Sequence, residues 1–71
     1  MKLRFTNHAK YRILERKIKI DDIKSTIKNP DYCGYTFDNK MVARKLIGDK
    51  TTEVIYTKSK SSILVITIYS L

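Results

Sequence analysis

An Asn-Pro pair near the middle of the chain, Asn29-Pro30, separates two stretches of different hydrophobic periodicity. Before it, apolar residues recur at three- and four-residue spacing without an intervening Gly or Pro, which is typical of helices. After it, short runs of β-branched and aromatic residues alternate with polar turn segments, which is typical of strands. Because proline disfavours helical backbone in the residue before it, the change is abrupt. The sequence therefore predicts helices before Pro30 and a sheet after it.

Two helices are predicted in the first stretch. The first follows a cap at Thr6 or Asn7 and runs to about Lys17. The second has acidic residues in its first turn and ends at Asn29-Pro30. The apolar positions are Ala9 and Ile13 in the first helix and Ile20, Ile23 and Ile27 in the second, whose first-turn acids are Asp21 and Asp22. The two helices are expected to pair as an α-hairpin.

Four strands are predicted in the second stretch. They are residues 32–37, 41–47, 53–57 and 63–69, joined by polar turns into an antiparallel meander. The last strand is almost wholly apolar and is expected inside the sheet, whereas the segments near residues 34 and 50 are polar enough to be edges. A helix pair packed on one face of this four-stranded sheet gives a two-layer α+β fold, one domain over residues 1–71, with the other face open.

Strict alternation in the last strand divides its side chains between the two faces of the sheet. One set is Ile63, Val65, Thr67 and Tyr69, and the other set is Leu64, Ile66 and Ile68. The second set is the more apolar, so we expect it to pack under the helices. Thr67 and Tyr69 then lie together on the open face.

Size and charge limit the classes of function that the chain can have. A domain of 71 residues buries one thin core, so its functional site is expected to be an open surface rather than a deep pocket, and no cofactor is expected. The formal net charge is +8, and the basic residues are spread over the whole chain. A polyanion such as RNA is the natural partner, although a solvated lysine-rich surface would give the same balance.

Cysteine usage and hydropathy predict a soluble, cytoplasmic protein that binds no structural metal. Cys33 is the only cysteine, so it has no internal partner and belongs to no zinc-binding cluster. The chain begins Met1-Lys2-Leu3-Arg4 without an apolar leader region, and its longest apolar run is too short to cross a bilayer. No membrane partner is expected.

Three residues at four-residue spacing, His8, Arg12 and Arg16, form a stripe along the first helix. Histidine exchanges protons near neutral pH, and arginine binds phosphate through a planar pair of donors. The competing interpretation is structural: His8 lies at the start of the helix, and Glu15 simply pairs with Arg12 on an exposed surface. Arg16 lies near the apolar side of the helix, where a charge is costly without a partner or a purpose.

The strands supply the other candidate residues. A metal-free ribonuclease needs a base for the ribose 2′-hydroxyl, cations for the phosphate and an acid for the departing 5′-oxygen. Tyr69 and Lys45 complete that set with the helix stripe, although the sequence leaves open whether Lys45 or Arg44 faces Tyr69. Arg44, Tyr56 and Lys10 are candidates for RNA binding, through charge and stacking. The alternative for Tyr56 is an ordinary residue at the core boundary.

Taken together, these positions resemble a known family. The matching string is Phe5-Thr6-x-His8-Ala9-x-x-Arg12-x-x-Glu15-Arg16-x-Ile18, followed by Asn29-Pro30 and a closing Val65-Ile66-Thr67-Ile68-Tyr69. It resembles the DUF4258 family, which is grouped by fold with ribonucleases of the barnase, EndoU, colicin and RelE type. The resemblance implies a helix pair over a four-stranded sheet and a site made of His8, Arg12, Arg16, Lys45, Thr67 and Tyr69.

The sequence departs from the family pattern between the two helices. Lys17 stands where the family usually has a glycine that ends the first helix. Lys19 stands where Ser, Thr or Asp would cap the second helix, so we expect a tighter connection or a cap that shifts to Asp21.

The leading functional prediction is a metal-independent RNA endonuclease, the toxin of a toxin and antitoxin module, that leaves a 2′,3′-cyclic phosphate. Its partners would be RNA, free or on the ribosome, and a small acidic antitoxin. The alternative is a non-catalytic basic module that binds RNA, DNA or protein by charge and stacking.

Overall fold

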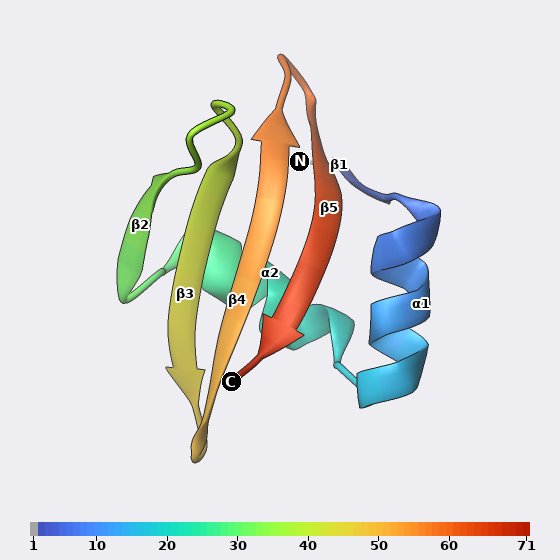
Figure 1. The fold of residues 1–71 in the computed structure, drawn as a ribbon, viewed down its shortest axis with the longest axis vertical. Helices are drawn as coiled ribbons and strands as arrows, with labels where there is room; N and C mark the ends of the chain where they lie inside the picture. The colour runs from blue at the N-terminus through green and yellow to red at the C-terminus, as the bar shows by residue number, and fades with distance from the viewer. Residues whose placement is uncertain (1) are drawn as a thin grey trace.

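Two helices and five strands make up the computed structural model, which describes residues 2–71 (Figure 1). The elements are β1 Lys2–Phe5, α1 Asn7–Arg16, α2 Ile20–Lys28, β2 Tyr32–Tyr35, β3 Met41–Ile47, β4 Lys50–Lys58 and β5 Ser62–Ser70. The strands form one mixed sheet in the order β1-β5-β4-β3-β2. The α+β class is therefore confirmed, and the antiparallel meander from β2 to β5 is present, but the sheet has five strands rather than four.

The additional strand, β1, pairs in parallel with the first half of β5. Its four residues alternate charged and apolar side chains, with Leu3 and Phe5 packed against the core. A four-residue strand buries too little to form alone, and β5 supplies the backbone partners. β1 also makes β5 an interior strand, as its composition predicts.

α1 begins where β1 meets the middle of β5, and Thr6 makes the junction. Its hydroxyl accepts a hydrogen bond from the Ala9 backbone N–H at 3.0 Å, which caps the helix as predicted. The same hydroxyl donates to the Ile66 carbonyl of β5 at 2.6 Å. This pair of bonds fixes the start of α1 against β5 and so sets which side chains of the helix reach the sheet.

The connection between the helices contains Lys17 and Lys19, the two residues that depart from the family pattern. Lys17 has φ 54° and ψ 46°, a left-handed conformation that glycine adopts more easily. α2 begins after Lys19, whose side chain makes no capping hydrogen bond, so the predicted shift of the cap to Asp21 is wrong. Asp21 and Asp22 instead lie in the first helical turn, where a negative charge favours the helix dipole.

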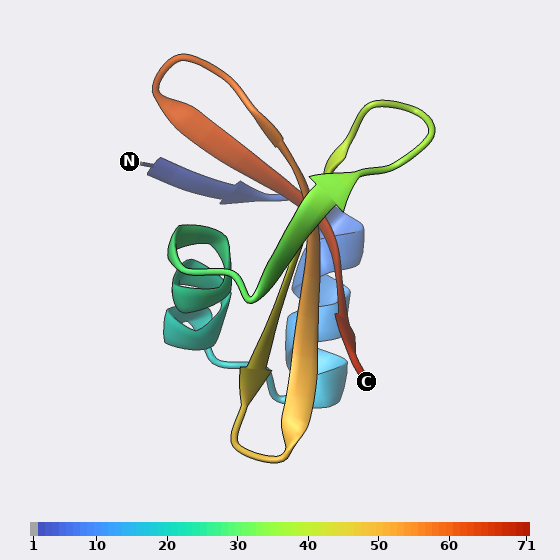
Figure 2. The same cartoon turned by 90° about the vertical axis from the view of Figure 1, so that its left-hand side faces the viewer.

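The helices do not form the predicted pair on one face of the sheet. α2 crosses behind the sheet and packs on β3 and β4, whereas α1 lies beside the sheet along β5 (Figures 1 and 2). The reason is the Thr6 junction, which holds α1 at the side of β5. One face of the sheet therefore rests on α2, and we call the opposite one the open face. It carries Arg44, Glu53, Thr67 and Tyr69.

A β-bulge in β5 changes the predicted division of side chains. Thr67 is opposite Ile55 and Val65 is opposite Tyr56, so Ile66 has no opposing residue and the alternation shifts there. Before the bulge the buried residues are Ile63 and Val65, and after it the buried apolar residue is Ile68. The expectation that Leu64 and Ile66 pack under the helices is therefore wrong. The expectation for Ile68, which is in the core, is confirmed. Thr67 and Tyr69 share the open face, as predicted.

The core lies between α2 and the sheet. Its fully buried side chains include Ile23 from α2, Val54 from β4 and Val65 and Ile68 from β5.

The predicted edge at residue 34 is confirmed, because β2 is the outer strand, but the edge near residue 50 is wrong because β4 lies in the middle of the sheet. Within residues 2–71, neither helix is long and apolar enough to cross a membrane.

Candidate functional site

Five side chains form a continuous row across the open face, from α1 to the outer strand. In the sheet, Tyr69 is directly opposite Glu53, Glu53 is opposite Arg44, and Arg44 is opposite Tyr32. Residues directly opposite each other in antiparallel strands project to the same face, with Cβ atoms about 4.5–5.5 Å apart. Arg12 extends the row from α1, since its guanidinium carbon lies 5.4 Å from the centre of the Tyr69 ring. We call these five residues the sheet row.

The α1 end of the sheet row holds two buried polar atoms that lack hydrogen-bond partners within residues 2–71. They are Arg12 Nε and Thr67 Oγ1. Arg12 is held in place by Tyr69 and by Glu15, whose carboxylate lies 3.5 Å from Arg12 Nη1. A buried donor or hydroxyl without a partner costs about 1–3 kcal/mol. Both groups remain able to form a hydrogen bond, and a phosphate oxygen is an acceptor suited to each of them.

The middle of the sheet row holds a carboxylate that the sequence prediction missed. Glu53 lies on β4 with its side chain only 13% exposed, and it accepts a hydrogen bond from Arg44 Nε. The sequence placed Glu53 at the start of a strand, but its role depended on which residues stand opposite it. The pairing of β4 with both neighbours brings Glu53 between Arg44 and Tyr69.

The β2 end of the sheet row is an arginine stacked on an aromatic ring. The Arg44 guanidinium carbon lies 5.2 Å from the centre of the Tyr32 ring, within the range of a cation–π contact. Gly34 makes this arrangement possible, because a Cβ added there would lie 2.9 Å from the Tyr32 hydroxyl oxygen. Tyr32 stays exposed, so its ring and the guanidinium present stacking surfaces to solvent.

His8 stands one helical turn before Arg12 on α1, at the same side of the helix. It is exposed at the second position of the helix, close to the Thr6 junction with β5. The rise of an α-helix places it about 6 Å from Arg12 along the axis. His8 and Arg12 therefore share one side of α1, and Tyr69 is the strand residue that Arg12 contacts.

Lys45 does not join this site, and Arg44 is the cation that faces Tyr69's side of the sheet. Lys45 shares its face with the buried Ala43, on the side that α2 covers. Its ammonium donates to the Asn29 carbonyl at 2.9 Å and lies 3.8 Å from the Asp31 carboxylate. The prediction of a catalytic Lys45 is therefore contradicted: its charge ties β3 to the end of α2.

Arg16 shares its carboxylate partner, Glu15, with Arg12 and lies at the end of α1. Its side chain is half exposed and its Nε lies 3.7 Å from Glu15, so it is not the costly charge at the core that the sequence suggested. It lines a shallow groove at the end of the sheet with Lys50 and Thr52. A helix turns 100° per residue, so each four-residue step leaves a 40° drift, and Arg16 projects about 80° from His8.

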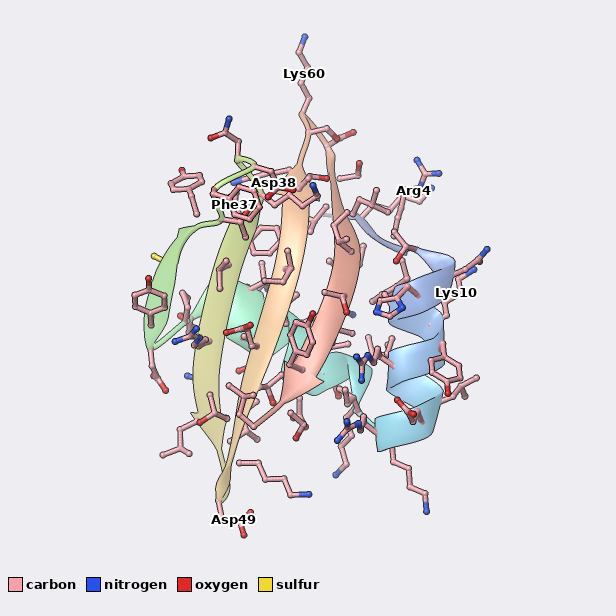
Figure 3. All side chains as sticks on the ribbon, in the orientation of Figure 1. Arg4, Lys10, Phe37, Asp38, Asp49 and Lys60 are labelled. Atoms are coloured by element: carbon pink, nitrogen blue, oxygen red, sulfur yellow. The ribbon has the colours of Figure 1, made fainter. Side chains whose placement is uncertain are left out.

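Two predicted RNA contacts are displaced from the open face. Lys10 points away from the sheet on the outer side of α1 (Figure 3). Tyr56 is 5% exposed and belongs to the core on the α2 side, so it offers no stacking surface. Burial raises the pKa of the Tyr56 phenol. The alternative in which Tyr56 is a structural residue at the core is the correct one.

Within residues 2–71, no group of three or more His, Cys, Asp or Glu side chains is arranged to hold a metal ion. Cys33 is free and exposed on β2.

Comparison with known proteins gave one family. The family described as Domain of unknown function (DUF4258) matches residues 5–70, which includes both helices and the strands β2 to β5. No curated protein and no solved structure matches the chain.

Proposed function

We propose, for a chain that belongs to the DUF4258 family, that it is a metal-independent RNA endonuclease of RelE-like type which cuts through a 2′,3′-cyclic phosphate. The observation that carries the proposal is the pair of unpartnered buried groups, Arg12 Nε and Thr67 Oγ1, beside Tyr69. These are donors without an acceptor on a chain of net charge +8. An RNA phosphate supplies the missing acceptor atoms and the opposite charge.

The reaction requires charge stabilisation at the phosphate and two proton transfers. Arg12 and Thr67 bind the non-bridging oxygens, and the cation opposes the charge that grows on them as the 2′-oxygen attacks. Tyr69 keeps the guanidinium in position through its ring. His8 exchanges a proton with the ribose or with the departing 5′-oxygen, because imidazole both accepts and donates near neutral pH.

The biological setting that fits this activity is a toxin and antitoxin module. An acidic antitoxin would cover the arginines of the open face by charge complementarity and hold the enzyme inactive. The substrate would be single-stranded RNA, free or on the ribosome, since the open face offers exposed rings for unpaired bases.

A second function is favoured by the two arginine–tyrosine pairs at the ends of the sheet row. Stacking and charge alone would make the domain a single-stranded nucleic-acid binder without catalysis. Such binding would weaken steeply with salt and would not depend on His8.

Cleavage of a defined single-stranded RNA in excess EDTA tests the proposal. Wild-type protein is expected to cut and to leave cyclic phosphate ends, and His8→Ala is expected to lower the rate by about 10²–10⁴-fold because a proton-transfer group is lost. Lys10→Ala is the matched control, since it changes the outer side of the same helix and should cut normally.

Each outcome decides between the two functions. Cutting that EDTA abolishes would contradict a metal-independent reaction. RNA that stays intact with wild-type protein, but is bound in a salt-dependent manner, would establish the binding module instead.

A further inference from the structure

Glu53 is a carboxylate in a place where a nucleic-acid surface should be positive. It lies on the middle strand of the sheet, with arginines of the sheet row on both sides of it, and its side chain is 13% exposed. A phosphate laid across the row is repelled by this charge. A surface that served only to bind RNA would be improved by a neutral residue here, so the carboxylate requires another explanation.

A structural ion pair with Arg44 explains Glu53 only in part. The Glu53 carboxylate accepts from Arg44 Nε, and within residues 2–71 this is the only hydrogen bond its side chain makes. Arg44 is half exposed and already stacks on Tyr32. A buried charge with a single partner is costly, and a glutamine would provide the same accepting oxygen without that cost.

The position of Glu53 relative to the phosphate-binding end of the row gives it a chemical role. Tyr69 stands directly opposite Glu53, and the Tyr69 ring supports Arg12. Thr67 lies two residues before Tyr69 on the same face. Glu53 therefore faces this end of the row from β4, whereas Glu15, the carboxylate that contacts Arg12, lies on α1.

We propose that Glu53 is the base that accepts the ribose 2′-hydroxyl proton, an inference that rests on the proposed function. The proton passes to the Glu53 carboxylate while the 2′-oxygen forms a bond to phosphorus. The bond between phosphorus and the 5′-oxygen breaks, and the leaving oxygen takes a proton from His8. The products are a 2′,3′-cyclic phosphate and a 5′-hydroxyl, and His8 acts as the acid.

Glu53→Gln separates this role from a structural one, because the amide retains an oxygen that accepts from Arg44. The rate of cleavage at saturating RNA is expected to fall by about 10²–10⁴-fold, while RNA affinity is retained or increased. Wild-type cleavage should slow at acidic pH, where the base becomes protonated. The cleavage rate of Glu53→Gln should lack this decline.

Asp49→Asn is the matched control, because it removes the same charge from the turn at the end of the sheet, away from the sheet row (Figure 3). Its cleavage rate should equal that of the wild type. Thermal unfolding of both variants shows that the fold is retained, and Glu53→Asp provides a second carboxylate variant, which should keep part of the activity.

The two proposals fail in different ways. Cleavage by wild type and by Glu53→Gln at rates within about threefold would overturn the role of Glu53 and leave the ribonuclease in place. Intact RNA with the wild type would overturn both. A Glu53→Gln variant that loses RNA binding together with cleavage would identify Glu53 as a structural partner of Arg44 and contradict its role as the base.

Discussion

Thr67 shows at the scale of one residue how a functional site can reduce stability. Its side chain is 8% exposed and its hydroxyl has no partner within residues 2–71, although valine has nearly the same shape. An unpaired buried hydroxyl is unfavourable in the folded protein, and a bound phosphate would remove that cost.

We therefore predict that Thr67→Val stabilises the free protein by about 1 kcal/mol and weakens RNA cleavage. Urea unfolding measures the first effect, and the cleavage assay measures the second. Thr57→Val is a suitable control on the neighbouring strand, because Thr57 is more exposed and should show little change in either measurement. A Thr67→Val variant that is markedly less stable would mean that the hydroxyl has a partner in the folded state.

At the scale of elements, the turn after α1 contains a strained residue. Lys17 adopts a left-handed conformation, which costs a residue with a Cβ roughly 1–2 kcal/mol. Glycine avoids that cost but loses more backbone entropy on folding.

Lys17→Gly is expected to raise the free energy of unfolding by about 0.5–1 kcal/mol, because the strain it relieves exceeds the entropy it adds. Lys10→Gly in the middle of α1 is the contrasting variant and should lower it by about 1 kcal/mol. Chemical denaturation of the two variants gives the comparison, and destabilisation by Lys17→Gly would contradict the assigned conformation.

The elements also show where sequence patterns were sufficient and where they were not. Local signals identified both helices, the Thr6 cap and the β2 to β5 meander, because capping and periodicity act within a few residues. The parallel pairing of β1 depends on a partner about sixty residues away, and the bulge at Ile66 depends on the register of two strands. Neither is encoded in a local window, so the extra strand and the faces of the first half of β5 were missed.

For the molecule as a whole, the same distinction explains the candidate site. Arg12 and Tyr69 were predicted and are in contact, and Thr67 shares the open face with Tyr69, because one helix face and one strand face fix their positions. Lys45 was wrong and Glu53 was missed, because the relevant information is which residues stand opposite each other across three strands. The charges of the open face therefore depend on strand pairing, which no local sequence pattern encodes.

The proposed function requires that RNA lie on the open face of the sheet. Methyl NMR spectra of the protein, titrated with a 2′-O-methyl RNA that cannot be cleaved, test it directly. Val42 and Ile55 flank the sheet row on the open face, whereas Ile23 and Val54 are buried on the α2 side. We predict that the methyl signals of the first pair shift on binding while those of the second pair do not. Shifts confined to the α2 side, or to the outer surface of α1, would contradict the account.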